Sequence, residues 1–105
     1  MAETRIIREV GYFEFRELIE RFKGKIKVNS HAYFRLNEQQ RKVYKDEALI
    51  GLLTEEKPAF IGIQANKNYA TFFRKKWGYL RLLFKVTKEN IEIVTFYITD
   101  HLPKI

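Results

Sequence analysis

The residues best suited to chemistry lie in and just after two apolar stretches near the end of the chain. The first stretch, GYLRLLFKV at residues 78–86, carries Arg81 near its centre, and the second, residues 91–99, is followed by His101. A guanidinium can bind a phosphate through two hydrogen bonds, and an imidazole titrates near neutral pH and can transfer a proton. Arg81 and His101 are therefore candidates for catalysis on a phosphodiester, and His31 is a further candidate proton carrier.

Each of these residues also has a purely structural interpretation. Arg81 could lay its aliphatic stem on a sheet and pair with a carboxylate, and His101 could belong to a tail without a role. His31 and Arg35 are spaced i, i+4 and would share one helix face with Glu38 and Lys42. That face could be solvated, with an Arg35–Glu38 pair, or it could form a second phosphate-binding patch.

The positive charge of the chain is concentrated in one segment. The formal net charge is +7, and residues 21–45 hold eight Lys or Arg side chains against the single carboxylate of Glu38. Such a segment attracts phosphate backbones, anionic membranes or an acidic protein, although surface lysines can also serve only solvation. The candidate nucleic-acid-binding residues in it are Lys23, Lys25, Lys27, Arg35, Arg41 and Lys42.

A second group of candidates mixes cations with aromatic rings, as proteins that bind single-stranded nucleic acid do. Most aromatic side chains of a small sheet nevertheless belong to its core. The candidates of this group are Arg74, Lys75, Lys76, Trp77, Tyr79 and Lys85.

Composition narrows the classes of site that the chain can carry. It has no cysteine and two histidines far apart, so we expect no disulfide, no metal site and no cofactor. No apolar run approaches the roughly 20 residues of a membrane span, and the first residues are charged where a signal peptide would be apolar. We therefore expect a cytoplasmic protein with no membrane partner.

Helical periodicity dominates the first half of the chain. Phe15, Leu18, Ile19 and Phe22 recur at i, i+3, i+4 and i+7 and predict a helix over residues 12–23. KIKVN at 25–29 predicts a short edge strand, and Ser30 is expected to cap a helix over residues 31–42. DEALIGLL at 46–53 predicts a further helix, with three leucines on one side, and Pro58 ends this region.

Strand patterns replace helical ones after Pro58. Residues 59–65 and 69–76 predict one hairpin around a turn at 66–68, and residues 78–99 predict a second. Pairing Val86 with Ile91 places Lys85 opposite Glu92 and Arg81 opposite Phe96.

This register assigns the residues of the second hairpin to two faces of the sheet. One face, expected to form the core, carries Leu80, Leu82, Phe84, Val86, Ile91 and Ile93. The other carries Tyr79, Arg81, Leu83, Lys85, Val94 and Phe96. The chain is therefore expected to be one α+β domain, residues 1–105, with N-terminal helices and a short strand packed on one face of an antiparallel sheet of about four strands.

The sequence GYLRLLFKVTKENIEIVTFYITDH resembles the C-terminal half of the RelE/ParE-like toxin superfamily, in which a strand of the form Gly-x-x-Arg precedes a turn, an apolar strand and a histidine or tyrosine. SHAYFRLNEQQR is similar to the His-Ala-x-x-Arg segment of the related BrnT-like and domain of unknown function 4258 group. The resemblance implies a RelE-like domain, an acidic antitoxin partner and metal-independent cleavage of RNA, in some members of ribosome-bound messenger RNA. It assigns Arg81 to the scissile phosphate, His101 to proton transfer and Lys104 to a supporting role.

The functional expectation is an RNA-binding protein of the RelE-like toxin type, with metal-independent endoribonuclease activity as the chemistry that the candidate residues suit. The alternative is a nucleic-acid-binding or protein-interaction module that uses the same basic surface without catalysis.

Overall fold

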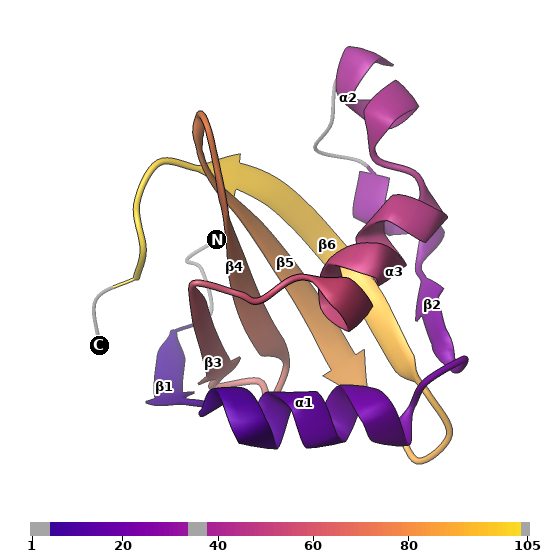
Figure 1. Ribbon diagram of the computed structural model, residues 1–105, viewed down its shortest axis with the longest axis vertical. Coiled ribbons are helices and arrows are strands. Elements are labelled where there is room, and N and C mark those ends of the chain that lie inside the picture. The colour runs from indigo at the N-terminus through magenta and orange to yellow at the C-terminus, as the bar shows by residue number, and fades with distance from the viewer. Residues whose placement is uncertain (1–4, 34–37, 104–105) are drawn as a thin grey trace.

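The fold was analysed in a computed structural model that describes residues 5–33 and 38–103. Its elements are β1 (Ile6–Glu9), α1 (Tyr12–Arg21), β2 (Ile26–Val28), the 3-10 helix η1 (Ser30–Tyr33), α2 (Glu38–Val43), α3 (Asp46–Glu55), β3 (Phe60–Gln64), β4 (Tyr69–Lys75), β5 (Gly78–Val86) and β6 (Ile91–Thr99) (Figure 1). The α+β class is confirmed. The expectation of about four strands was wrong, because six strands form one sheet in the order β1-β3-β4-β5-β6-β2.

Both additional strands lie at the edges of the sheet. β1 was not predicted, because four residues that include Arg8 and Glu9 carry little strand signal, and it is defined by antiparallel pairing with β3. β2 was predicted as an edge strand and is one, but it belongs to the sheet instead of packing on its face. It pairs in parallel with β6, which the long connection through α2 and α3 permits.

The predicted helices are found with different boundaries. The helix expected over 12–23 is α1, which ends at Arg21, and its buried residues are Phe15, Leu18 and Ile19. The continuous helix expected over 31–42 was wrong, because the described part of this segment forms η1 and α2. The cap of η1 also differs, since the Asn29 side chain, not Ser30, accepts a hydrogen bond from the His31 backbone N–H at 2.9 Å.

The register of the second hairpin is confirmed at its turn and changes further along. Val86 pairs with Ile91 and Lys85 with Glu92, but a β-bulge at Val94 shifts the remaining pairs by one residue. Arg81 therefore lies opposite Tyr97, and the predicted pairing with Phe96 was wrong. Phe96 turns into the main core instead and is fully buried.

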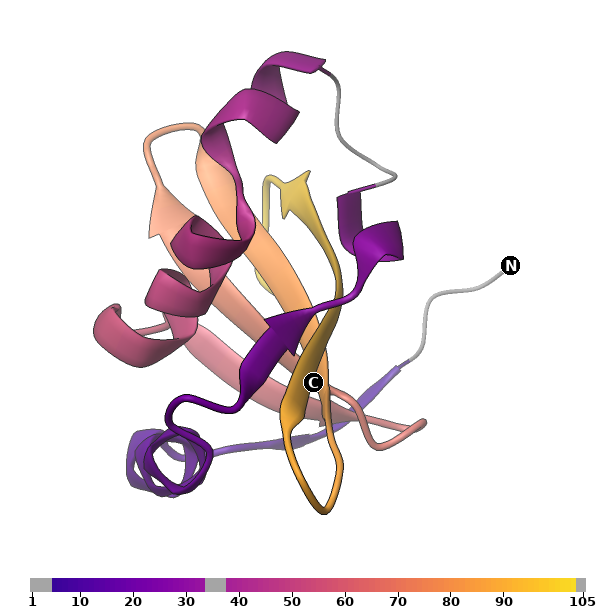
Figure 2. The same ribbon diagram turned by 90° about the vertical axis from the view of Figure 1, so that its right-hand side faces the viewer.

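The main core lies on the face of the sheet that packs against α1 and α3, which we call the helix-side face (Figure 2). Strand residues Leu80, Leu82 and Phe84 pack there together with Leu18 of α1 and Leu49 of α3. The opposite face, which we call the second face, carries a smaller apolar cluster: Ile6, Ala70, Phe72 and Leu83 are buried in it, and Phe60, Tyr79, Val94, Tyr97 and Leu102 pack against them.

Val86, predicted for the core, lies at the end of β5 and is 36% exposed. None of the helices in the described ranges is both long and apolar enough to cross a membrane.

Candidate functional site

Arg81 and His101 line one hollow on the second face of the sheet. The hollow has a volume of about 240 Å³, and its other lining residues are Phe72, Tyr97, Thr99 and Pro103. The structure thus brings together the two residues that the sequence selected from different elements.

Cross-strand pairing holds Arg81 in place. Phe72 of β4, Arg81 of β5 and Tyr97 of β6 are register partners in one row across the sheet. The guanidinium carbon lies 5.2 Å from the centroid of the Phe72 ring and 5.5 Å from that of the Tyr97 ring. Contacts of this kind attract a cation to the ring face. Because Arg81 is only 8% exposed, its guanidinium is held in a defined position at the base of the hollow.

His101 reaches the hollow because the chain turns back after β6. Leu102 packs against the apolar cluster of the second face and Pro103 lines the hollow, so the segment is anchored beyond the histidine. The imidazole Nδ1 lies 2.6 Å from Oδ1 of Asp100, and this hydrogen bond lowers the pKa of the Asp100 carboxyl. With Nδ1–H donating to Asp100, Nε2 is the nitrogen that can exchange a proton with a ligand. The imidazole itself is 79% exposed.

A second cation lies beside the hollow in the next row of the sheet. Arg74 of β4 is the register partner of Tyr79 in β5, and Tyr79 is the partner of Thr99 in β6. An Arg74 guanidinium nitrogen donates a hydrogen bond to the Tyr79 hydroxyl at 3.3 Å. Arg74 and Tyr79, both candidates of the group that mixes cations with aromatic rings, therefore lie close to the Arg81 hollow.

Three other members of that sequence group point elsewhere. Lys75 forms an ion pair with Glu56 at 3.2 Å. Lys76 and Trp77 are exposed in the turn between β4 and β5, and Trp77 lines a different hollow.

The lysines of the basic segment lie at the other end of β6. Lys23, Lys25 and Lys27 are exposed around β2, which pairs with residues Ile91–Ile93 at the start of β6, whereas the Arg81 hollow adjoins its end at Thr99. At about 3.3 Å per strand residue, roughly 20 Å separate the two regions. The structure therefore does not bring these lysines into the Arg81 hollow.

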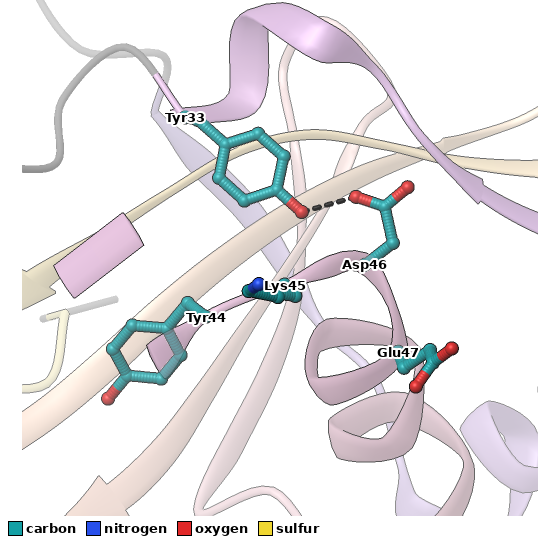
Figure 3. A pocket seen from close by; sticks show the side chains of 5 residues that line it. All are labelled: Tyr33, Tyr44, Lys45, Asp46 and Glu47. Atoms are coloured by element: carbon teal, nitrogen blue, oxygen red, sulfur yellow. Dashed lines mark hydrogen bonds between the residues drawn. The ribbon is translucent and has the colours of Figure 1, made fainter. Parts of the chain in front are cut away.

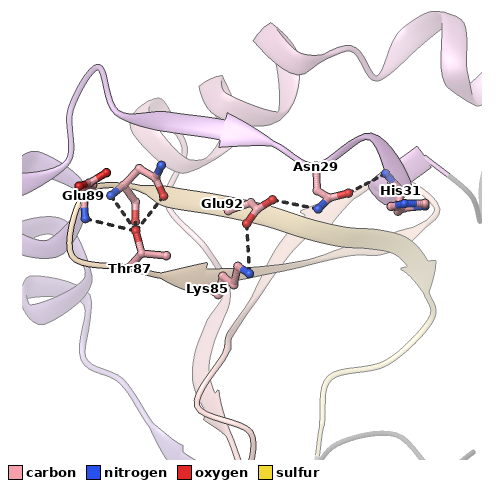
Figure 4. Close-up of polar contacts among 7 residues, drawn as sticks. Asn29, His31, Lys85, Thr87, Glu89 and Glu92 are labelled. Atoms are coloured by element: carbon pink, nitrogen blue, oxygen red, sulfur yellow. Dashed lines mark hydrogen bonds and ion pairs between the residues drawn. The ribbon is translucent and has the colours of Figure 1, made fainter.

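A polar network near these lysines includes Lys85 and approaches His31 (Figure 4). Lys85 pairs with Glu92 at 3.3 Å, and the Asn29 amide donates to Glu92 at 2.9 Å. The hydrogen bond from Asn29 and the charge of Lys85 lower the pKa of the Glu92 carboxyl. His31 is exposed, its backbone N–H donates to Asn29, and it does not line the Arg81 hollow. His31 and His101 thus belong to separate sites.

Four of the sequence candidates remain. Lys42 is exposed on α2. Arg35, Lys104 and the side chain of Arg41 lie outside the described residues.

One hollow was not anticipated from the sequence. It has a volume of about 480 Å³ and is lined by Tyr33, Tyr44, Lys45, Asp46 and Glu47 (Figure 3). The Tyr33 hydroxyl donates a hydrogen bond to Asp46, and burial together with this carboxylate raises the pKa of Tyr33. Both tyrosine rings pack edge-on against Phe96. No spacing rule joins Tyr33 to Asp46, so only the folded chain shows this hollow.

Within residues 5–33 and 38–103, no group of three His, Asp or Glu side chains is arranged to hold a metal ion. Comparison with protein-family models, with curated proteins and with solved structures finds no match for the chain. The function must therefore be argued from the hollows and from the charges around them.

Proposed function

We propose that the protein binds single-stranded RNA at the Arg81 hollow and cleaves it without a metal ion. The observation that carries this proposal is the placement of Arg81 and His101 in one hollow with two aromatic rings. A cation fixed at the base of a hollow can hold a phosphate group, and an adjacent imidazole can move a proton at its rim.

Binding would involve three kinds of group. Arg81 would donate hydrogen bonds to the non-bridging oxygens of one phosphate, and Arg74 lies near enough to meet a neighbouring phosphate. Tyr79 and Tyr97 are partly exposed and offer ring surface to an unpaired base. The lysines around β2 would attract the rest of the strand over a longer distance.

Cleavage would proceed by attack of the ribose 2′-oxygen on the adjacent phosphorus. Nε2 of His101 would accept the proton of the 2′-hydroxyl as the bond from O2′ to phosphorus forms and the bond from phosphorus to O5′ breaks. A water molecule would protonate the leaving 5′-oxygen, and His101 would return its proton to solvent. The products would be a 2′,3′-cyclic phosphate and a 5′-hydroxyl, and Arg81 would stabilise the charge that develops on the phosphorane oxygens.

The proposal includes two partners. The RNA could be free or ribosome-bound messenger RNA, and a small acidic antitoxin is the protein partner that the RelE-like resemblance implies. A cytoplasmic location is part of this proposal.

The test incubates purified protein with single-stranded RNA and with translating ribosomes, in each case with EDTA, and analyses the products for a 2′,3′-cyclic phosphate. Arg81→Ala should lower the cleavage rate by about two to three powers of ten, as does the loss of one preorganised donor to a developing charge. RNA affinity should fall less. His101→Ala should lower the rate by roughly two to four powers of ten and change the shape of the pH profile of cleavage.

His31→Ala is the matched comparison, because this histidine lies outside the hollow, and its rate should stay close to that of the wild type. If the cleavage rate falls in His31→Ala and not in His101→Ala, the active site lies near the Asn29–Glu92 network and not in the Arg81 hollow.

The second candidate function is RNA binding without catalysis. It is favoured by the 79% exposure of the His101 side chain, which leaves the position of the imidazole weakly constrained. RNA binding that depends on Arg81, with no cleavage in either assay, would establish this function in place of the nuclease. Cleavage that EDTA abolishes would contradict the metal-independent mechanism.

A further inference from the structure

An apolar hollow at the same end of the sheet has no place in the mechanism above. It has a volume of about 350 Å³, within the range of small-ligand sites, and is lined by Gln39 and Val43 of α2, Tyr44, Trp77 and Ile98. Three of these side chains are unusually exposed for their type: Val43 is 67% exposed, Trp77 45% and Ile98 41%. Val43, Trp77 and Ile98 belong to neither buried cluster of the sheet, whereas Tyr44 also packs against the main core.

The Trp77 hollow and the Arg81 hollow meet across the end of one strand. Ile98 and Thr99 are consecutive residues of β6, and successive side chains of a strand point to opposite faces. Ile98 lines the Trp77 hollow, whereas Thr99 lines the Arg81 hollow. Trp77 itself lies in the turn between β4 and β5, at the end of the sheet where β6 finishes (Figure 1). A strand of RNA could therefore pass from one hollow to the other around this end.

Charge around the hollow favours a polyanion over an apolar peptide. Three of its four aromatic or branched lining residues have a lysine as a direct neighbour in the chain, namely Lys42 before Val43, Lys45 after Tyr44 and Lys76 before Trp77. No carboxylate is among the lining residues. Gln39 adds an amide that can both donate and accept hydrogen bonds, as the edge of a base requires. Apolar walls, an indole face and flanking cations together match an unpaired base with its phosphates.

We infer that the Trp77 hollow is a base-binding subsite, which takes an unpaired base of the RNA strand whose phosphate Arg81 holds. The inference rests on the proposed function and extends it, because it requires the strand to turn around the end of β6. The base stacks on the Trp77 indole between Val43 and Ile98, and the ring of Tyr44 closes the hollow.

The chain provides its own probe, because Trp77 is its only tryptophan. Addition of a short single-stranded RNA to the wild-type protein should quench the tryptophan emission, and the quenching should saturate together with the anisotropy change of the same RNA carrying a dye. An abasic oligonucleotide of the same length should bind through its phosphates and leave the emission unchanged. Trp77→Ala should lower RNA affinity by about 5- to 100-fold, and Trp77→Phe by less, because it keeps a ring.

The matched control is Phe13→Ala, which removes an exposed aromatic side chain of α1. Phe13 is 84% exposed and lies outside both hollows, so RNA affinity and quenching should be unchanged. Circular dichroism should show that all three variants fold.

Two results together would overturn the subsite and leave the proposed function intact. The wild-type protein would bind RNA through Arg81 without a change in its tryptophan emission, and Trp77→Ala would bind RNA with the wild-type affinity. Absence of RNA binding by the wild type would overturn both. Quenching by the abasic oligonucleotide as strong as that by RNA would also overturn the subsite, because no base would then be needed.

Discussion

The two faces of the sheet are built from the same strands and differ in what they bury. On the helix-side face, apolar residues of α1, α3 and the strands form one continuous cluster, with Phe84, Phe96 and Leu82 fully buried. On the second face the buried residues include a guanidinium, Arg81, and an amide, Gln64, beside a few apolar side chains. Burying polar groups costs free energy, so the second face contributes less to stability than the helix-side face. The helix-side face therefore accounts for most of the stability, and the second face for the proposed chemistry.

The same contrast appears along one row of the second face. Phe60, Phe72, Arg81 and Tyr97 are successive register partners across β3, β4, β5 and β6. The rings of Phe60 and Phe72 meet edge to face with centroids 5.8 Å apart. A cation in this position is held by ring faces, and the helix-side face has no equivalent arrangement among its buried described residues.

The largest expected effect lies on the helix-side face. Phe84 is fully buried and stacks on Tyr69 with ring centroids 5.0 Å apart, so Phe84→Ala should lower the free energy of unfolding by about 3–5 kcal/mol. Leu83→Ala, one residue away on the second face, should cost about 2 kcal/mol, because Leu83 is 9% exposed and its cluster is smaller. Urea denaturation measures both variants. An equal or larger loss for Leu83→Ala would remove the energetic difference between the two faces.

A smaller loss of stability is expected for Arg81→Met. Methionine keeps an apolar stem of similar length and removes the contacts of the guanidinium with Phe72 and Tyr97, which are together worth about 1–2 kcal/mol. RNA affinity should fall at the same time, because the phosphate loses its donor. Denaturation and RNA titration of the same preparation separate the two effects. A stability loss as large as that of Phe84→Ala, with RNA affinity retained, would show that Arg81 serves the fold and not the hollow.

The smallest effect concerns the polar network at the other end of the second face. The Glu92 carboxyl has its pKa lowered from 4.5 by Asn29 and Lys85, so the ionised form stabilises the fold. This contribution is complete well above pH 4.5 and is lost as the pH falls through the lower pKa of the folded state. Glu92→Gln should therefore cost about 1 kcal/mol or less near neutral pH, and the difference from the wild type should disappear in acid, below the pKa of the folded state.

Glu89→Gln is the control for this pH dependence, because Glu89 bonds to Thr87 through its backbone N–H. It should leave the free energy of unfolding nearly unchanged at both pH values. A Glu92→Gln difference that persists in acid would mean that the glutamine loses packing and not charge.

Much of the fold could be predicted from local pattern. The spacing of Phe15, Leu18 and Ile19 predicted α1, and alternation together with the turn residues predicted both hairpins and the Lys85–Glu92 pair. These features depend on residues close in sequence. β1 could not be predicted in this way, because its four residues become a strand only through pairing with β3. The bulge at Val94 was also missed, and with it the side on which Phe96 lies.

The candidate site divides in the same manner. The sequence by itself determined the inventory: a strand arginine on the face away from the main core, a histidine after the last strand, a basic segment and a chain without thiols. The residue types show which functional groups the chain carries, and the alternation of side chains along a strand shows which face of the sheet each one lies on. Tertiary structure alone decided which of them meet. The bulge placed Tyr97 beside Arg81. The return of residues 100–103 onto the second face brought His101 to the same hollow. The parallel pairing of β2 with the start of β6 kept His31 and the lysines away from that hollow. These contacts join residues that are far apart in sequence. Each one forms only when the whole sheet has formed, because the entropy cost of closing the long loops between them must be offset by many contacts at once.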